Sequence, residues 1–412
     1  MSERKNIVFL TGTRADFGKL RPLIETLDTS EEFDFSLFVT GMHTSYKYGY
    51  TVNEVFKALD EDKLSQGPHS VYTYINHSNG EPMEQVLANT IMGLSRYVAQ
   101  YAPDLIVVHG DRVEALAGAI VGALQNIYVA HIEGGERSGT VDELIRHAVT
   151  KLSHIHFVAN DEAAQRLKQL GEKEEAVYVI GSPDIDIMLS PNLPAFNEAQ
   201  ERYDIPFEHY GILLYHPVTT SLQETEQTAK SLVNAVLADD HNYIIIYPNN
   251  DKGAEAIFRE YRRVEGNERF RVYPSLRFPY FLSMLNHSDF ILGNSSAGVR
   301  EAPVYGVPSI NVGSRQNNRF CANSIIDVES WDGDTIADAI QTALKMPRGK
   351  PSYYFGEGNS AENFLKTIKQ EKLWQTPKQK QFMDLDIHSL MCQAVGQANK
   401  QAQQNIACLW ND

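Results

Sequence analysis

Short apolar runs alternate with amphipathic stretches along the first half of the chain. Runs such as 7–11 and 105–109 contain almost no polar residue, which is typical of strands buried on both faces of a sheet. The stretches 14–26, 82–100 and 112–124 have helical spacing, and the last is rich in Ala and Gly, so it could pack closely on a sheet. The alternation predicts a doubly wound parallel α/β fold.

The pattern breaks at 190–206, which carries three prolines, and then restarts. We predict the domain junction just before or within this segment. Further strands are predicted at 211–215, 243–247, 270–272, 290–292 and 309–312, with helices between most of them. An amphipathic helix is predicted at 361–370. Residues 43–80 have little periodicity and are expected to form a long loop region with short helices, and the Gln-rich end of the chain should be peripheral or partly disordered.

The stretch 290–300, FILGNSSAGVR, predicts a strand, a tight polar turn and a helix from Ala297 to about Tyr305. A helix N-terminus with nearby hydroxyls attracts anions, phosphate above all. Glu301 is spaced to reach a ribose beside such a phosphate. The alternative is that Ser295 or Ser296 is only an N-cap.

Polar side chains also follow the strand ends of the first half. Asp111 and Arg112 follow 105–109, as either a salt-bridged cap or a pair aimed into a cleft. Glu133 follows 128–132, and the two glycines after it would let the backbone approach a ligand. Thr140 and Glu143 form a capping box, which leaves Asp142 free to point at the cleft, with Arg146 one turn further along.

The loop 11–19 is neither a P-loop nor GxGxxG, which argues against NAD. Arg14 and Lys19 could still meet a diphosphate there, although Lys19 could equally be a solvated helix residue. His43 lies at another strand end. A lone histidine in such a place is more often a structural residue than a catalyst. The strand ends of the second half carry further polar residues: His216, Asn250, Arg315 and Arg319.

Composition narrows the possible partners. The formal net charge of -16 makes nucleic acid an unsuitable main partner. The cysteines have no CxxC spacing, which suggests neither a zinc site nor a disulfide framework and fits a reducing cytosol. No apolar run is long enough for a signal peptide or a membrane span, so we expect a cytoplasmic protein.

Carboxylates from one half would thus face an anion site from the other. This combination suits removal of a proton from carbon on a phosphate-bearing substrate. Clustered carboxylates also raise one another's pKa, which an acid/base pair needs at neutral pH.

Taken together, the motifs resemble those of the hydrolysing UDP-N-acetylglucosamine 2-epimerases of bacterial sialic acid biosynthesis. The resemblance runs from about Asn6 to about Asp386, on TGTRADFGKL, HGDR, HIEGGERSGTVDELIRHAVTKLSHIHFVAN, IGSPDIDIM, HPVTT, YPNND and GNSSAGVREAPVYGVPSINVGSRQNNR. It implies a glycosyltransferase-B-like architecture, with Rossmann-like domains at 1–188 and 189–358. It also implies a C-terminal helix at 359–387 that crosses back to the first domain, and leaves 388–412 as a peripheral tail.

The resemblance implies that UDP-GlcNAc loses its C2 proton and expels UDP, and that water then adds to the 2-acetamidoglucal with inversion at C2. Neither a metal nor another cofactor is required, and family members are homodimers or homotetramers. The implied catalytic residues are Asp111, Glu133, Asp142 and His216. The implied UDP contacts are Arg14, Lys19, Arg112, Ser295, Ser296, Gly298, Glu301 and Arg315. The implied sugar contacts are His43, Arg146, Asn250 and Arg319.

Three alternatives remain at this point. The same chemistry could act on a UDP-2,4-diacetamido-2,4,6-trideoxy sugar for legionaminic acid. A glycosyltransferase of this architecture would need an acceptor site and would have no use for so many carboxylates. A catalytically silent sugar-nucleotide binder would be expected to have lost Asp111, Glu133 and Asp142, and all of them are present.

Overall fold

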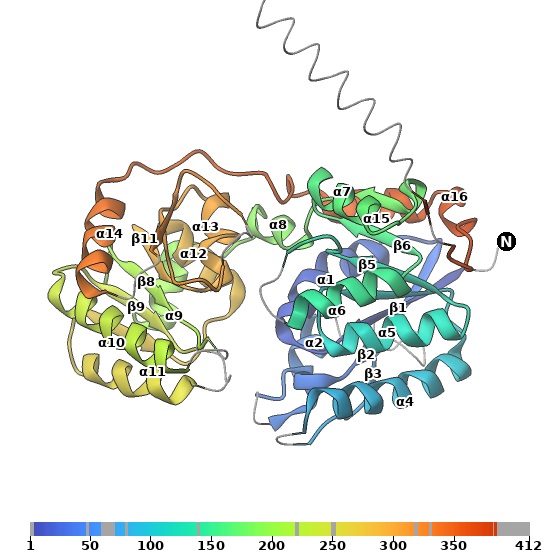
Figure 1. Cartoon of the computed structure of the whole chain (residues 1–412), viewed down its shortest axis with the longest axis horizontal. Coiled ribbons are helices and arrows are strands. Elements are labelled where there is room, and N and C mark those ends of the chain that lie inside the picture. The colour runs from blue at the N-terminus through green and yellow to red at the C-terminus, as the bar shows by residue number, and fades with distance from the viewer. Residues whose placement is uncertain are drawn as a thin grey trace, which may run out of the picture.

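Two lobes, each built on its own parallel sheet, make up the computed structural model of the chain (Figure 1). The structure describes residues 4–46, 49–58, 71–78, 81–137, 141–218, 222–248, 253–316, 320–328, 332–381 and 383–384. All statements below concern these residues.

The first sheet has seven strands in the order β3-β2-β1-β4-β5-β6-β7. The strands are β1 Lys5–Thr11, β2 Phe33–Val39, β3 Val71–Thr73, β4 Leu105–His109, β5 Tyr128–Ile132, β6 Ile155–Val158 and β7 Val177–Val179. The helices are α1 Arg14–Asp28, α2 Val52–Ala58, α4 Met83–Tyr101, α5 Val113–Leu124, α6 Val141–Leu152 and α7 Asp161–Gln169, with 3₁₀ turns η1 Gly41–Thr44 and η3 Glu174–Ala176.

The second sheet has six strands in the order β10-β9-β8-β11-β12-β13. The strands are β8 Gly211–Leu214, β9 Tyr243–Ile246, β10 Phe270–Tyr273, β11 Phe290–Gly293, β12 Ser309–Val312 and β13 Ile325–Val328. The helices after β7 are α8 Pro183–Met188, α9 Phe196–Tyr203, α10 Leu222–Ala238, α11 Ala254–Tyr261, α12 Phe278–His287, α13 Glu301–Val304, α14 Gly333–Lys345, α15 Ser360–Ile368 and α16 Glu371–Trp374, with 3₁₀ turns η4 Arg262–Val264 and η5 Ser296–Gly298.

Both sheets are parallel throughout, which confirms the predicted fold class. In each sheet the strand order reverses beside the first strand, so β1 lies between β2 and β4, and β8 lies between β9 and β11. In such sheets, ligands bind beyond the carboxyl ends of the strands at the reversal. The polar residues noted after β1, β4, β8 and β11 therefore lie where this topology forms a site.

The helix α5 packs closely against the first sheet, as its Ala/Gly content predicted. A Cβ atom added at Gly118 would lie 2.5 Å from Val108 Cγ1, and one at Gly122 would lie 2.2 Å from Val129 Cγ2. The small residues therefore bring α5 directly onto β4 and β5, which carry Asp111 and Glu133 at their ends.

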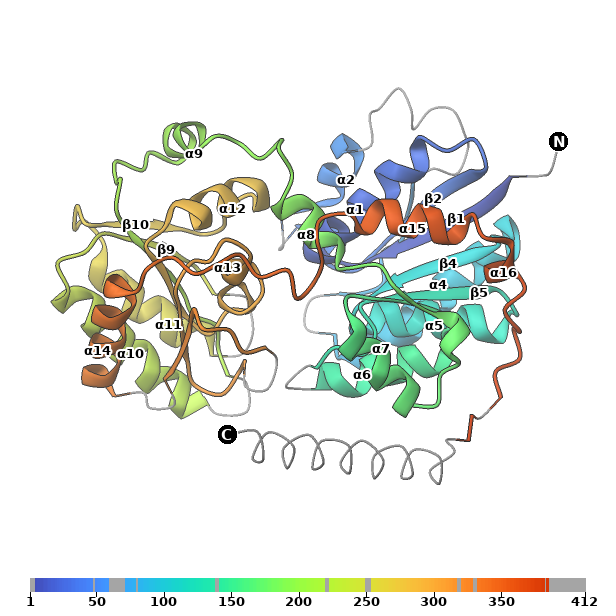
Figure 2. The same ribbon diagram turned by 90° about the horizontal axis from the view of Figure 1, so that it is seen from above.

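The chain returns to the first lobe after completing the second sheet (Figure 2). Helix α15 packs on α1 and α8, and Phe364 is fully buried against Phe9 and Phe157. The following segment is also anchored there, because the Tyr128 hydroxyl donates to the carbonyls of Trp374 and Thr376. Helices α15 and α16 thus lie on the first lobe. The domain boundaries at 188 and 358 stay predictions, and the tail 388–412 lies outside the described residues.

Two local expectations were incomplete. The region 43–80 contributes the edge strand β3 as well as α2, so it is more regular than its composition indicated. The helix expected from Ala297 to Tyr305 is instead the short turn η5 followed by α13. Pro303 has no N–H to donate to the carbonyl of Val299, which prevents one continuous helix.

No helix among the described residues has the length and apolar character needed to cross a lipid bilayer.

Candidate functional site

Asn294, at the end of β11, ties together three strand ends of the second lobe. Its side chain accepts from the backbone N–H of His216 at 2.7 Å and donates to the His216 carbonyl at 2.9 Å. Its backbone carbonyl accepts hydrogen bonds from the side chains of Arg315 at 3.1 Å and Gln316 at 2.9 Å. Asn294 is fully buried, so its hydrogen bonds hold the predicted residues His216, after β8, and Arg315, after β12, beside the turn that follows β11.

The turn after Asn294 contains the predicted anion site. Ser295 is the N-cap of η5, and its hydroxyl accepts from the N–H of Ala297 at 3.2 Å. The cap alternative therefore applies to Ser295. Gly298 packs closely on β12, because an added Cβ would lie 2.5 Å from Ser309 Oγ and the serine side chain would have to move. Contacts of Ser295, Ser296 and Gly298 with UDP stay predictions.

Glu301 begins α13 beside this turn. Burial, followed by the charge of Asp184, raises the pKa of the Glu301 carboxyl. Its Oε2 atom is buried and accepts no hydrogen bond from any described residue. A buried acceptor of this kind needs a donor, which a ligand hydroxyl could supply.

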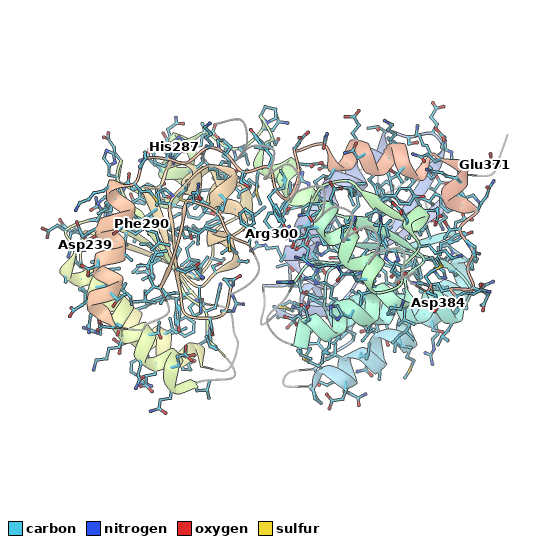
Figure 3. The ribbon with its side chains drawn as sticks, turned by 45° about the horizontal axis from the view of Figure 1, so that its top comes forward. Asp239, His287, Phe290, Arg300, Glu371 and Asp384 are labelled. Carbon is cyan, nitrogen blue, oxygen red and sulfur yellow. The ribbon has the colours of Figure 1, made fainter. Side chains whose placement is uncertain are left out.

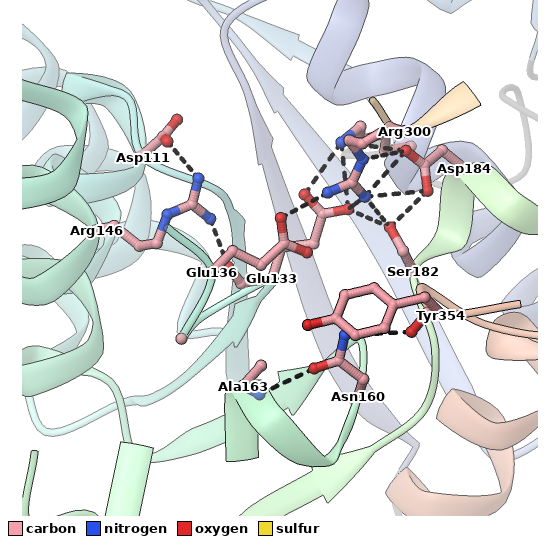
Figure 4. Close-up of polar contacts among 12 residues, drawn as sticks. Asp111, Glu133, Glu136, Arg146, Asn160, Ala163, Ser182, Asp184, Arg300 and Tyr354 are labelled. Carbon is pink, nitrogen blue, oxygen red and sulfur yellow. Dashed lines mark hydrogen bonds and ion pairs between the residues drawn. The ribbon is translucent and has the colours of Figure 1, made fainter. Parts of the chain in front are cut away.

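Arg146 on α6 organises the carboxylates of the first lobe (Figure 4). Its guanidinium pairs with Asp111 and donates to the carbonyl of Glu133 at 2.5 Å. The Arg146 side chain is almost completely buried, so it acts in this structure as a brace between the ends of β4 and β5. Asp142 lies one turn earlier on α6 and within electrostatic reach of Arg112. The structure thus brings Asp111, Glu133 and Asp142 to one edge of the sheet.

Glu133 has the most elaborate surroundings of these carboxylates. Its backbone is left-handed, with φ 62°, which is rare outside glycine and is held by the neighbouring contacts. Lys19 Nζ lies 3.1 and 3.2 Å from its two carboxylate oxygens, and His109 Nε2 lies 3.1 Å from Oε2. Gly135, two residues along, packs closely on α7, since an added Cβ would lie 2.4 Å from the carbonyl oxygen of Ala163.

Arg300 crosses from the second lobe to this carboxylate, and Figure 3 places it at the junction of the lobes. Its Nη2 lies 2.8 Å from Glu133 Oε1 and 3.1 Å from Asp184 Oδ2, and its Nη1 lies 2.5 Å from Glu136 Oε2. Arg300 is 6% exposed, and Asp184 is fully buried. We call Lys19, Glu133, Glu136, Asp184 and Arg300 the junction cluster.

The junction cluster corrects one electrostatic expectation. Burial opposes the charge on Glu133, but Arg300 and Lys19 outweigh it and hold the pKa of its carboxyl well below the usual range. The same balance lowers the pKa of Asp184. Clustering with Asp111 and Asp142 was expected to raise the pKa of Glu133. The expectation was wrong for Glu133 because cations are interleaved with the carboxylates.

His216 shows the opposite balance. Burial and the neighbouring charge of Arg315 lower the pKa of its imidazole to about 3. The ring is therefore neutral at pH 7 and can donate from one nitrogen.

The other predicted contacts have protein partners in this structure. Arg14 forms a two-pronged pair with Glu54 of α2, and Arg112 lies 3.4 Å from Glu114. Both arginines are about half exposed, so a ligand can still compete for them.

His43 is 1% exposed, and hydroxyls of Thr11 and Thr51 contact its ring nitrogens. This favours a structural role for His43. Its contact with a sugar stays a prediction, and Asn250 and Arg319 lie outside the described residues.

The sequence matches the family described as UDP-N-acetylglucosamine 2-epimerase over residues 25–369. The chain belongs to the UDP-N-acetylglucosamine 2-epimerase family. This confirms the family to which the sequence motifs pointed.

Three similarities show how close the relationship is. A UDP-N-acetylglucosamine 2-epimerase from Neisseria meningitidis serogroup B is 46% identical over 386 residues, which cover 93% of this chain and 100% of that protein. A UDP-N,N'-diacetylbacillosamine 2-epimerase (hydrolyzing) from Legionella pneumophila is 36% identical over 368 residues, covering 88% and 96%. A solved structure of a UDP-GlcNAc 2-epimerase from Neisseria meningitidis bound to UDP-GlcNAc shares the fold, with a TM-score of 0.73, 17% identity and coverage of 88% and 99%.

Sequence reasoning on this epimerase-family chain missed several residues that build the site. Arg300, Asp184, Ser182, Glu136 and Asn294 all stand inside motifs that carry the resemblance, GVREA, IGSPD, EGGER and GNSS, but none was assigned a role. The signal for Arg300 was its place next to Glu301. Its partners Asp184 and Glu133 lie 116 and 167 residues away in the sequence, so only the fold reveals the contacts.

His131 is a further unpredicted support. It is fully buried on β5, where Nε2 lies 2.9 Å from the Gly110 carbonyl and Nδ1 lies 3.1 Å from Thr150 Oγ1. It therefore holds the turn that presents Asp111. Burial lowers the pKa of its imidazole to about 3.

This histidine predicts acid sensitivity. The pKa of His131 in the folded protein lies below the unfolded value of about 6.5. Its contribution to the free energy of unfolding is therefore fully present above pH 6.5 and is lost as the pH falls toward 3. At pH 4.5 the loss from His131 alone should be about 2–3 kcal/mol. His131→Phe should be less stable at pH 7.5, because Gly110 loses its donor, but should lose correspondingly less between pH 7.5 and 4.5. Urea unfolding across this range measures both, and equal pH dependence in the two proteins would contradict a buried neutral histidine.

Proposed function

We propose that this member of the UDP-N-acetylglucosamine 2-epimerase family is a hydrolysing enzyme that converts UDP-GlcNAc and water to N-acetylmannosamine and UDP. The observation that carries the proposal is the junction cluster, which joins the Ser295–Glu301 turn of one lobe to the carboxylate edge of the other. A nucleotide bound on that turn would have its sugar beside Asp111, Glu133 and Asp142. The 46% identity with the Neisseria epimerase over nearly the whole chain supports the same substrate.

The second lobe would hold the UDP. Ser296, at the start of the turn, suits the diphosphate, and Arg315, which donates to the Asn294 carbonyl, adds a positive charge. The buried Glu301 oxygen would accept a hydrogen bond from a ribose hydroxyl. His216, neutral because its pKa is about 3, would donate a hydrogen bond to the departing phosphate oxygen.

The first half of the reaction would be an elimination. A carboxylate removes the C2 proton, the electron pair of the C2–H bond forms the C1–C2 double bond, and the C1–O bond breaks to release UDP. Glu133 is a poor candidate to take this proton, because Arg300, Lys19 and His109 already surround its carboxylate. Asp142 or Asp111 would then act as the base, and the ionised Glu133 would stabilise developing positive charge.

The second half would be a hydration. Water adds its hydroxyl to C1, and a protonated carboxyl delivers hydrogen to C2 on the opposite face, which inverts C2. The products are N-acetylmannosamine and free UDP, so no phosphate–sugar bond re-forms. Hydrolysis is supported by the second relative, whose name includes "hydrolyzing" at 36% identity. N-acetylmannosamine of this origin would supply sialic acid synthesis.

That relative also favours a second candidate. It acts, by its name, on UDP-N,N'-diacetylbacillosamine, a UDP sugar with acetamido groups at C2 and C4. The mechanism would be unchanged, because the reacting atoms are C1 and C2. The contacts around C4 would decide between the two substrates.

Proton NMR of the purified protein with UDP-GlcNAc in heavy water tests the proposal. We expect free UDP and N-acetylmannosamine, with deuterium at C2, because proton removal and return exchange that position with solvent. Turnover of the diacetamido sugar alone would favour the second candidate. Recovery of both sugars unchanged would contradict a hydrolysing epimerase.

The base assignment can be tested with Asp142→Asn. Loss of the carboxylate should lower turnover by about a hundredfold or more, the usual scale for an acid/base group, while UDP affinity changes little. The matched control is Glu143→Gln, which makes the same chemical change one residue along α6, where Glu143 lies 3.3 Å from His147. Turnover should change by less than about threefold in the control. Equal losses of UDP affinity and turnover in Asp142→Asn would instead indicate a structural residue.

A further inference from the structure

Arg300 is the feature whose placement the proposed mechanism leaves unexplained. It stands next to Glu301 on the nucleotide side of the structure, yet its guanidinium lies among first-lobe and connecting-segment groups (Figure 4). An arginine that bound the diphosphate would point toward the turn at Ser296. Arg300 points across the junction instead.

Each nitrogen of the guanidinium has a partner from outside the second sheet. Nη1 binds Glu136, Nη2 binds Glu133 and donates to Ser182 Oγ at 2.7 Å, and Nε lies 3.3 Å from Asp184 Oδ2. The Phe355 ring covers it, with the guanidinium carbon 4.5 Å from the ring centroid. A fork of five donors matches this set of acceptors, whereas the single ammonium of lysine would not.

We propose that Arg300 is the positioning residue through which closure of the two lobes completes the catalytic centre: only when the lobes meet does it fix the Glu133 carboxylate in its reactive orientation. This inference rests on the proposed function. It adds a role for a residue to which the proposed mechanism assigns no contact with the reacting atoms or the nucleotide.

The contacts of Glu133 couple closure of the two lobes to the orientation of its carboxylate. Glu133 has a left-handed backbone, a conformation that costs on the order of 1–3 kcal/mol for residues other than glycine. Lys19 and His109, which also contact its carboxylate, both belong to the first lobe. Arg300 alone among its described side-chain partners comes from the second lobe. Separation of the lobes would therefore remove Arg300 from Glu133 while leaving Lys19 and His109 beside it.

The charges around Glu133 decide the consequence of losing Arg300. The charged and titratable groups that face Glu133 and Arg300 from the packed elements are Lys19, His109, Arg146, Glu136, Asp184 and Glu301. Without Arg300, Glu133 and Asp184 keep only Lys19 as a shared permanent cation. The pKa of the Glu133 carboxyl would then rise, and its ionised form would persist only at higher pH.

A purely structural tie between the lobes is the competing explanation. It predicts that loss of Arg300 lowers stability and reduces activity equally at every pH. A positioning role predicts a specific change in the pH profile, because the ionisation of Glu133 depends on this arginine.

The test compares wild type, Arg300→Gln, Arg300→Lys and the control Arg269→Gln. Arg269 donates to the carbonyls of Leu237, Asp239 and His241 within the second lobe, so its loss measures the effect of a missing structural arginine. For Arg300→Gln, kcat on UDP-GlcNAc should fall by about a hundredfold, KM should stay within about threefold, and the acidic limb of the kcat profile should move up by about one pH unit. Arg300→Lys should keep the limb near its wild-type position at an intermediate rate, and Arg269→Gln should not move it.

Small-angle X-ray scattering provides a readout that does not require turnover. Arg300→Gln should show a larger radius of gyration than wild type, and Arg269→Gln should not. An unmoved acidic limb, or a compact Arg300→Gln protein, would overturn the inference. Failure of wild-type protein to release N-acetylmannosamine would overturn the proposed function, and the scattering comparison would still decide whether Arg300 holds the lobes together.

Discussion

The contact between Arg300 and Glu133 is the constraint on which the rest of the site depends. Neither group could be buried alone, because an unpaired charge inside a protein costs several kcal/mol. Here each charge is paired several times, with Lys19, Asp184 and Glu136 completing the set. The two lobes must therefore meet in one register to satisfy these charges, and that register brings the Ser295–Glu301 turn to the carboxylates.

Each lobe prepares its own half of this contact. In the first lobe, the close packing of α5 on β4 and β5 aligns two strand ends, and Arg146 and His131 hold the turns that follow them. In the second lobe, hydrogen bonds with Asn294 hold His216 and Arg315 beside the turn that follows β11. Rigid supports of this kind allow ionised groups to keep their geometry when substrate displaces water. A carboxylate that is already paired with cations is a poor base. Glu133 is paired with both Lys19 and Arg300, which leaves Asp111 and Asp142 as the candidates for proton removal.

Much of this arrangement could be predicted from the sequence. Unbroken apolar runs such as 105–109 identified buried parallel strands, and the alternation identified the doubly wound sheets. The residues after those strands were then correctly expected at the sheet edge, as Asp111 and Glu133 show. Strand-end positions are predictable because topology alone places them.

The supporting contacts could not be predicted in the same way. Arg300 looked like one more helix residue, and its partners come from segments far away in the sequence. The signs of the pKa shifts also depended on those partners, since Lys19 and Arg300 reversed the effect expected of clustered carboxylates. Local spacing likewise suggested a continuous helix after Ala297, and Pro303 restricted it to two short turns.

The most direct test of this account is a double-mutant cycle between Arg300 and Glu133, with Arg300→Gln, Glu133→Gln and the double variant compared by the free energy of unfolding. Direct pairing across the lobes predicts that the two single effects are not additive and that the coupling is about 1–3 kcal/mol. Additive effects, within about 0.3–0.5 kcal/mol, would mean that the two residues do not act on each other and would contradict the account.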